Sequence, residues 1–173
     1  MSDRTFFDTN IIAYAFDRSE RAKRLVCKEL VDMVFSGESP GALSNQVLAE
    51  LFVVLTQKVG KAVSKAKAGA IVRGLLDSST WSKLDCDSGT VARAAADSAT
   101  MPNHFWVLLI AETMRDGGVG RIYTENVSDF QGVPWIEAVN PFAARRKPGK
   151  GETGDSLKGL EGSASPAGKM PGG

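Results

Sequence analysis

The stretch TFFDTNIIAYAF, residues 5–16, decides the fold of this chain. A short apolar run ends at an acidic residue, Asp8, and the run that follows has the composition of a buried helix. A buried strand that passes directly into a helix is typical of a strand–helix–strand unit. The stretch therefore predicts a parallel sheet that is covered by helices.

The rest of the chain repeats this alternation of short apolar runs and longer helical patterns. Further strands are expected at residues 42–44, 81–84, 121–124 and 135–139. Helices are expected after a Ser19 cap, from a Ser44 or Asn45 cap to about Lys58, and over 64–76, 88–99 and 104–115. With right-handed crossovers, this order predicts an α/β fold, a three-layer α/β/α sandwich with a central parallel sheet of four to five strands.

Length and composition are those of one globular domain: 173 residues, of which 43% are hydrophobic. No apolar run approaches the roughly 20 residues that a membrane helix needs. The N-terminus lacks the basic and then apolar pattern of a signal peptide. The two cysteines, Cys27 and Cys86, lack metal-binding spacing, and Cys27 falls in a helical pattern as a buried thiol. These features predict a cytoplasmic protein with no membrane association.

The net charge of +1 is the sum of two unlike segments. Residues 1–144 carry a net charge of −2, whereas residues 145–173 carry +3 and hold eight of the 18 glycines. We expect the first segment to be the folded domain and the second to be a disordered Gly/Pro/Lys-rich tail. The Arg-Arg-Lys run that begins this tail is either solvated or a contact for nucleic acid.

Two carboxylates in apolar surroundings are the candidates for chemistry. Asp8 closes the first strand, and Glu50 is the sole charge in the apolar run 46–55. Sites in open parallel sheets form at the carboxyl ends of the strands, and buried acids need a partner or a cation. The alternatives are that Asp8 only caps the following helix and that Glu50 lies at an exposed helix edge. If the two acids meet, their oxygens suit Mg²⁺, which can activate water at a phosphodiester.

Five segments, in order and at fitting separations, resemble the PIN-domain family, especially its bacterial VapC-type toxins. They are FFDTNI (6–11), SNQVLAEL (44–51), HFWVLLIA (104–111), YTENVSDF (123–130) and VNPF (139–142). The resemblance covers residues 5 to 142.

This resemblance implies a PIN-like fold and cleavage of RNA by a ribonuclease that depends on Mg²⁺ or Mn²⁺. It also implies a type II toxin, a cognate antitoxin that covers the site, and a homodimer. Asp8 would be a metal ligand, and Glu50 would be a ligand directly or through water. Asn126 falls where the family has Asp or Asn, and Asp129 lies just beyond it and would serve the same cluster.

The third motif departs from the family pattern at Val107, where the family has an acid. Valine cannot bind a cation. Glu112 is turned about 140° away around the helix, and His104 shares the Val107 face. His104 is either a solvent-exposed residue at the start of the helix or a ligand for Mn²⁺ or a transition metal. Val107 therefore indicates an inactive copy, a chain altered to remove activity, or an enzyme with weaker metal binding.

Candidate RNA contacts lie between Leu51 and Leu76, where the sequence has no acid. Lys58, Lys61 and Lys65 follow one another at spacings of 3 and 4. A second basic cluster occupies residues 18–24. These runs are either solvated faces or contacts for phosphates.

Three other functions compete with the nuclease hypothesis. The main alternative is a catalytically impaired PIN domain that binds RNA or an antitoxin without cutting. A haloacid-dehalogenase-type phosphatase needs a second acid where this chain has Asn10. A dinucleotide-binding protein needs a glycine-rich loop after the first strand, and none is present.

Overall fold

The computed structural model describes residues 3–143. Within this range one sheet has five strands in the order β3-β2-β1-β4-β5, and every neighbouring pair is parallel. The strands are β1 (Thr5–Phe7), β2 (Gly41–Ser44), β3 (Trp81–Leu84), β4 (Arg121–Tyr123) and β5 (Glu137–Val139). The predicted parallel α/β fold is confirmed. The last strand is shorter than expected, because Ile136 N donates to Val133 O in a turn.

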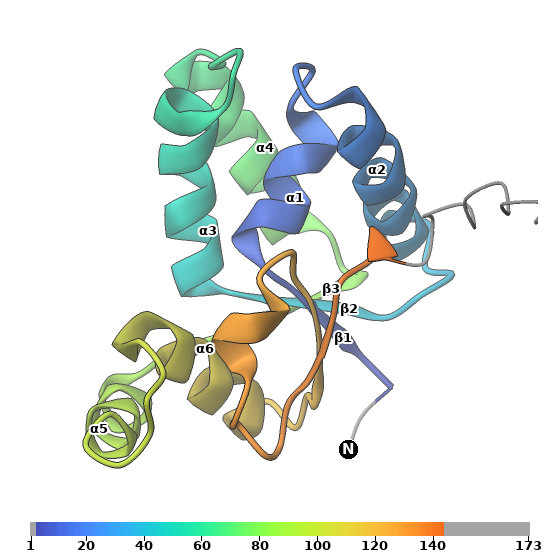
Figure 1. Ribbon diagram of the computed structural model, residues 1–173. Coiled ribbons are helices and arrows are strands. Elements are labelled where there is room, and N and C mark those ends of the chain that lie inside the picture. The colour runs from blue at the N-terminus through green and yellow to red at the C-terminus, as the bar shows by residue number, and fades with distance from the viewer. Residues whose placement is uncertain (1–2, 144–173) are drawn as a thin grey trace, which may run out of the picture.

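The helices lie on both faces of this sheet, as the connections require. They are α1 (Thr9–Phe16), α2 (Arg21–Phe35), α3 (Asn45–Val53), α4 (Lys65–Asp77), α5 (Ser88–Asp97) and α6 (Phe105–Asp116). The chain runs from β1 to β2 and β3 in one direction and then crosses to β4, on the other side of β1. Right-handed crossovers therefore place α1–α4 on one face and α5–α6 on the other, as Figure 1 shows.

Strand β1 lies at the centre of the sheet and of the main core. Phe6 is fully buried, and the Phe7 ring packs edge-on against Trp81 and Tyr123 at centroid distances of 4.9 and 5.4 Å. These contacts join β1 to strands on both sides of the sheet. Cys27 is also fully buried in this core and free, as predicted.

The helix starts agree with the sequence prediction in one case and differ in another. Ser44 caps α3, because its hydroxyl accepts from Val47 N at 3.2 Å. The predicted Ser19 cap is wrong: α2 begins at Arg21 and has no side-chain cap. The Ser19 hydroxyl instead donates to buried Asp17, at 2.7 Å, and so satisfies a carboxylate in the preceding turn.

Helix α3 does not end at Val53 but continues as a π-helical turn, η1 (Val54–Lys58). The prediction of a helix to about Lys58 is therefore confirmed, with a change of winding in its last turn. A short 3₁₀ helix, η2 (Val127–Phe130), occupies the loop between β4 and β5.

A buried ion pair joins α5 to α6. Glu112 is fully buried, and its carboxylate accepts from Arg93 Nε at 2.9 Å and from Arg115 at 3.4 Å. The two guanidinium groups compensate the buried charge. Glu112 is thus committed to this helix pair.

In the range 3–143 no helix is long and apolar enough to cross a bilayer. The predicted tail at 145–173 lies outside the described residues.

Close packing at Gly41 gives a stability prediction. A Cβ added there would lie 2.7 Å from Val34 Cγ1 and 3.1 Å from the Trp81 ring, so Gly41→Ala overpacks the core. We expect a loss of about 1–3 kcal/mol in the free energy of unfolding, measured by urea denaturation.

Gly74→Ala is the matched control, because a Cβ there meets nothing within 4 Å on helix α4. It should stabilise by about 0.5–1 kcal/mol through helix propensity. Equal effects of the two substitutions would contradict the packing described here.

Candidate active site

The candidate site lies where the strand order reverses, between β1 and β4. Ligands of open α/β sheets bind at such a switch point, at the carboxyl ends of the strands. Asp8 follows β1 and Thr124 follows β4, and Asp8 N donates to Tyr123 O at 3.0 Å. The Thr124 hydroxyl donates to Asp8 Oδ2 at 2.7 Å. Two segments far apart in the sequence therefore meet at one carboxylate.

Asp8 caps the following helix and also accepts hydrogen bonds from other side chains. Its Oδ1 accepts from Thr9 N at 2.7 Å and caps α1, as the simpler interpretation expects. Its Oδ2 accepts from Thr124 and from Asn10 Nδ2, the latter at 2.6 Å. The carboxylate is thus held in one orientation at the carboxyl end of β1 while it also caps the helix.

Glu50 is brought to the same place by Thr9. The buried Thr9 hydroxyl donates to Glu50 Oε2 at 2.9 Å, while its backbone N–H donates to Asp8. On the other side, Gln46 Nε2 donates to Glu50 Oε1 at 2.9 Å. The half-buried Glu50 is therefore fixed between α1 and α3. Thr9 links it to Asp8, because it donates a hydrogen bond to each of the two carboxylates.

The surroundings of Asp8 disfavour its negative charge. Burial raises the pKa of Asp8, and the hydrogen bonds from Thr124, Thr9 and Asn10 oppose this only in part, with Glu50 adding repulsion. In residues 3–143 neither Asp8 nor Glu50 forms an ion pair. A bound cation would relieve this imbalance.

The other two predicted site residues, Asn126 and Asp129, are exposed on the loop after β4. Asn126 N donates to the Thr124 hydroxyl at 3.1 Å, and so touches the residue that contacts Asp8. Asp129 O accepts from Asn103 Nδ2 at 2.7 Å, which ties the loop to the start of α6. Over residues 3–143 no three or more His, Cys, Asp or Glu residues form a group that could hold a metal.

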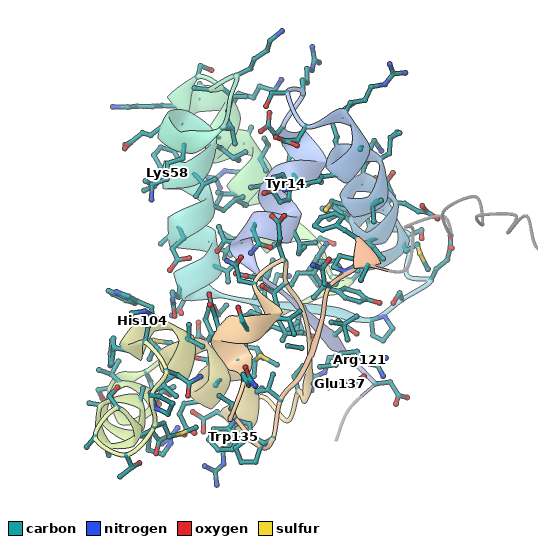
Figure 2. All side chains as sticks on the ribbon, in the orientation of Figure 1. Tyr14, Lys58, His104, Arg121, Trp135 and Glu137 are labelled. Atoms are coloured by element: carbon teal, nitrogen blue, oxygen red, sulfur yellow. The ribbon has the colours of Figure 1, made fainter. Side chains whose placement is uncertain are left out.

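The third motif lies at the start of α6. Val107 is half-buried and packs against the main core, whereas His104 is the exposed N-terminal cap residue of α6 (Figure 2). Glu112 points to Arg93 and Arg115, so it does not reach Asp8, as expected from its helical position. No carboxylate of the third motif therefore joins the pair Asp8 and Glu50.

Sequence reasoning missed Glu125, which sits beside the site. Glu125 Oε1 accepts from Lys23 Nζ at 2.6 Å, and Oε2 accepts from Tyr14 OH at 2.6 Å. Its backbone N–H donates to Asn10 Oδ1 at 3.3 Å. Burial alone would raise the pKa of Glu125. The hydrogen bonds from Lys23 and Tyr14 outweigh this effect and hold the pKa below its usual value. The only sequence feature that pointed to Glu125 as a site residue was its position directly after the predicted strand 121–124.

The three predicted RNA-contact lysines are all exposed, but they lie on three segments. Lys58 ends η1, Lys61 is in the following turn, and Lys65 starts α4. Their spacing is thus not that of one helix face. Figure 2 shows Lys58 on the α3 side of the molecule, away from Arg121 and Glu137 at the starts of β4 and β5.

Comparison with solved structures identifies this fold. The chain is similar to a protein in a toxin–antitoxin complex from Klebsiella pneumoniae, with 20% identity, a TM-score of 0.54, and coverage of 79% of this chain and 97% of that one. It is also similar to VapC20 of Mycobacterium tuberculosis, described as a toxin that cleaves the sarcin–ricin loop, with 16% identity, a TM-score of 0.56, and coverage of 73% and 95%.

No family model and no curated protein matched the chain. The structural likeness nevertheless shows a VapC-type PIN-domain fold, as the sequence motifs predicted. The segments quoted for the resemblance at residues 6–11, 44–51 and 123–130 are those that meet at the candidate site.

The hydrogen bond from Thr124 gives a prediction about ionisation. Thr124→Val keeps the side-chain shape but removes a donor that stabilises the charged carboxylate, so the pKa of Asp8 should rise further. The titration of the Asp8 carboxyl carbon by NMR measures this shift. Thr124→Ser, which keeps the hydroxyl, should titrate like the parent chain. An unchanged titration curve in Thr124→Val would show that the hydrogen bond has no influence.

Proposed function

We propose that this chain is a metal-dependent endoribonuclease and the toxin component of a type II toxin–antitoxin system, acting in the cytoplasm. The observation that carries the proposal is the pair of carboxylates, Asp8 and Glu50, joined through Thr9 at the switch point of a VapC-type PIN fold. Neither acid has a cationic side chain as a partner within residues 3–143.

The residues present fit a divalent cation. Mg²⁺ is commonly held by one or two carboxylates, with waters and substrate phosphates completing its shell, and Mn²⁺ accepts the same ligands. Asp8 and Glu50 would hold it. Such an ion, when bound, activates a water and offsets the charge that develops on a phosphodiester.

The remaining members of the catalytic set act around this pair. Thr9 and Thr124 orient the two carboxylates through hydroxyl hydrogen bonds. We assign Asn126 and Asp129 to the same cluster as polar groups on the substrate side, because both are exposed on the loop that Thr124 anchors. Lys58, Lys61 and Lys65 are assigned to phosphates of the RNA.

Two protein partners follow from the toxin assignment. One solved structure with this fold is a toxin–antitoxin complex, which supports a cognate antitoxin that covers the site. We also propose a homodimer, on the resemblance to VapC-type toxins.

A second candidate function is supported by Val107. In the described residues the site has two acids close together and no third one, so a copy that binds RNA or an antitoxin without cutting is the alternative. The two functions differ in one measurable property, cleavage.

Removing Asp8 tests the nuclease function. We expect Asp8→Ala to lower the rate of cleavage of a structured RNA, in Mg²⁺ or Mn²⁺, by roughly 100-fold or more, since it removes half of the carboxylate pair. Asp32→Ala, at an exposed acid on α2, is the control that should cut normally. Absence of cleavage by the parent chain, or full cleavage by Asp8→Ala, would refute the nuclease function.

Restoring the missing acid tests the role of Val107. Val107→Asp adds a negative oxygen ligand, so the affinity for Mn²⁺, measured by calorimetric titration, should rise roughly tenfold. Val107→Asn is the control for polarity without charge and should gain much less. Identical titration curves for Val107→Asp and the parent chain would show that Val107 does not limit metal binding.

A further inference from the structure

A groove of about 730 Å³ opens beside Glu50, between α3 with η1 on one side and the start of α6 on the other. The α3 wall presents Gln46, Glu50, Val53 and Lys58, and the α6 wall presents Trp106 and Leu109. Figure 2 labels Lys58, which lines the groove from η1, and His104, which directly precedes α6.

Trp106 is the dominant apolar feature of this groove. Its side chain is 62% exposed, although indole is among the largest apolar groups a protein can bury. Its ring packs edge-on against Phe105 at a centroid distance of 5.4 Å, and Phe105 is itself packed against the α5–α6 core. The indole therefore packs against Phe105 on one side and presents aromatic surface to the groove on the other.

Gln46 supplies an unused hydrogen-bond acceptor in the opposite wall. Its Nε2 donates to Glu50, which fixes the orientation of the amide. Its Oε1 is then left buried and without a partner. A buried acceptor that lacks a donor is costly, so this atom suits a ligand that carries an N–H group.

The charges at the groove favour an occupant with alternating anionic and aromatic parts. Glu50, with the cation proposed above, lies at one end, and Lys58 lies about two helical turns further along. Trp106 and Val53 provide apolar surface, with exposures of 62% and 39%. A single strand of RNA supplies both kinds of group, because its phosphates can approach Lys58 while its bases present aromatic faces and N–H groups.

We propose that this groove binds one nucleotide of a single-stranded RNA segment, with its base stacked on Trp106 and a base N–H group donating to Gln46 Oε1. The inference rests on the proposed function, because it assumes an RNA ligand at Glu50. Trp106 then positions the strand relative to the carboxylate pair, and Gln46 contributes to the choice of base.

Binding without cleavage is the direct test. The full chain is titrated into fluorescein-labelled oligo(A), oligo(C) and oligo(U) in EDTA, and the dissociation constants are measured by fluorescence anisotropy. Trp106→Ala should weaken binding of all three about tenfold, and Trp106→Phe should lie between Trp106→Ala and the parent chain. Leu25→Ala, at an exposed apolar residue on α2 outside the groove, is the matched control and should bind normally.

The acceptor is tested by the ranking of the three oligonucleotides. Gln46→Leu keeps the side-chain volume but removes the amide, so it should reduce the differences in affinity among them. A ranking that is unchanged by Gln46→Leu would overturn the assignment to Gln46.

Two results would overturn the stacking proposal. One is equal binding by Trp106→Ala and the parent chain, including the case in which neither binds. The other is sedimentation data in which Trp106→Ala turns a dimer into a monomer, which would show that a second copy fills the groove.

Cleavage assays in Mg²⁺ separate this inference from the proposed nuclease function. Cleavage that depends on Asp8, together with unchanged binding by Trp106→Ala, would refute the inference and keep the function. Binding that depends on Trp106, without any cleavage, would keep the inference and refute the nuclease.

Discussion

The hydrogen bond between the Thr124 hydroxyl and the Asp8 carboxylate joins two residues that are 116 positions apart, and the site depends on it. It exists because β1 and β4 are neighbours in the sheet, although helices α1–α6 and strands β2 and β3 lie between them in the sequence. The core contacts of Phe7 with Trp81 and Tyr123 hold β1 between its partners. The fold and the site are therefore stabilised by the same strand pairing.

The partners of Asp8 and Glu50 differ from those of the acids Glu112 and Glu125. Glu112 is compensated by Arg93 and Glu125 by Lys23, each with a carboxylate–cation contact under 3 Å. Asp8 and Glu50 instead receive hydrogen bonds from neutral groups, and no ion pair reaches either of them within residues 3–143. Glu112 and Glu125 have cationic partners, and the lack of one at Asp8 and Glu50 within this range is the reason for proposing that these two acids bind a cation from solution.

The arrangement around Glu50 places the proposed cation site next to the proposed RNA groove. Gln46 and Thr9 hold the Glu50 carboxylate from opposite sides, and the amide oxygen of Gln46, a residue that lines the groove of Trp106, is buried without a partner among the described residues. Gln46 thus both orients the Glu50 carboxylate and lines the groove. At Val107, where the sequence motif of VapC-type toxins has an acid, this chain has a side chain that packs against the main core, so the proposed cation site rests on Asp8 and Glu50.

The sequence by itself determined the order and type of the elements, because the apolar periodicity and the Asp8 stretch fit few arrangements other than a buried parallel sheet. It also indicated Asp8 and Glu50, since lone charges in apolar runs stand out. It did not determine the Ser19 contact, the pairing of Glu125 with Lys23, or the free acceptor of Gln46. These depend on which side chains from distant segments meet, and only the tertiary structure decides that because hydrogen bonds and ion pairs require contact in space.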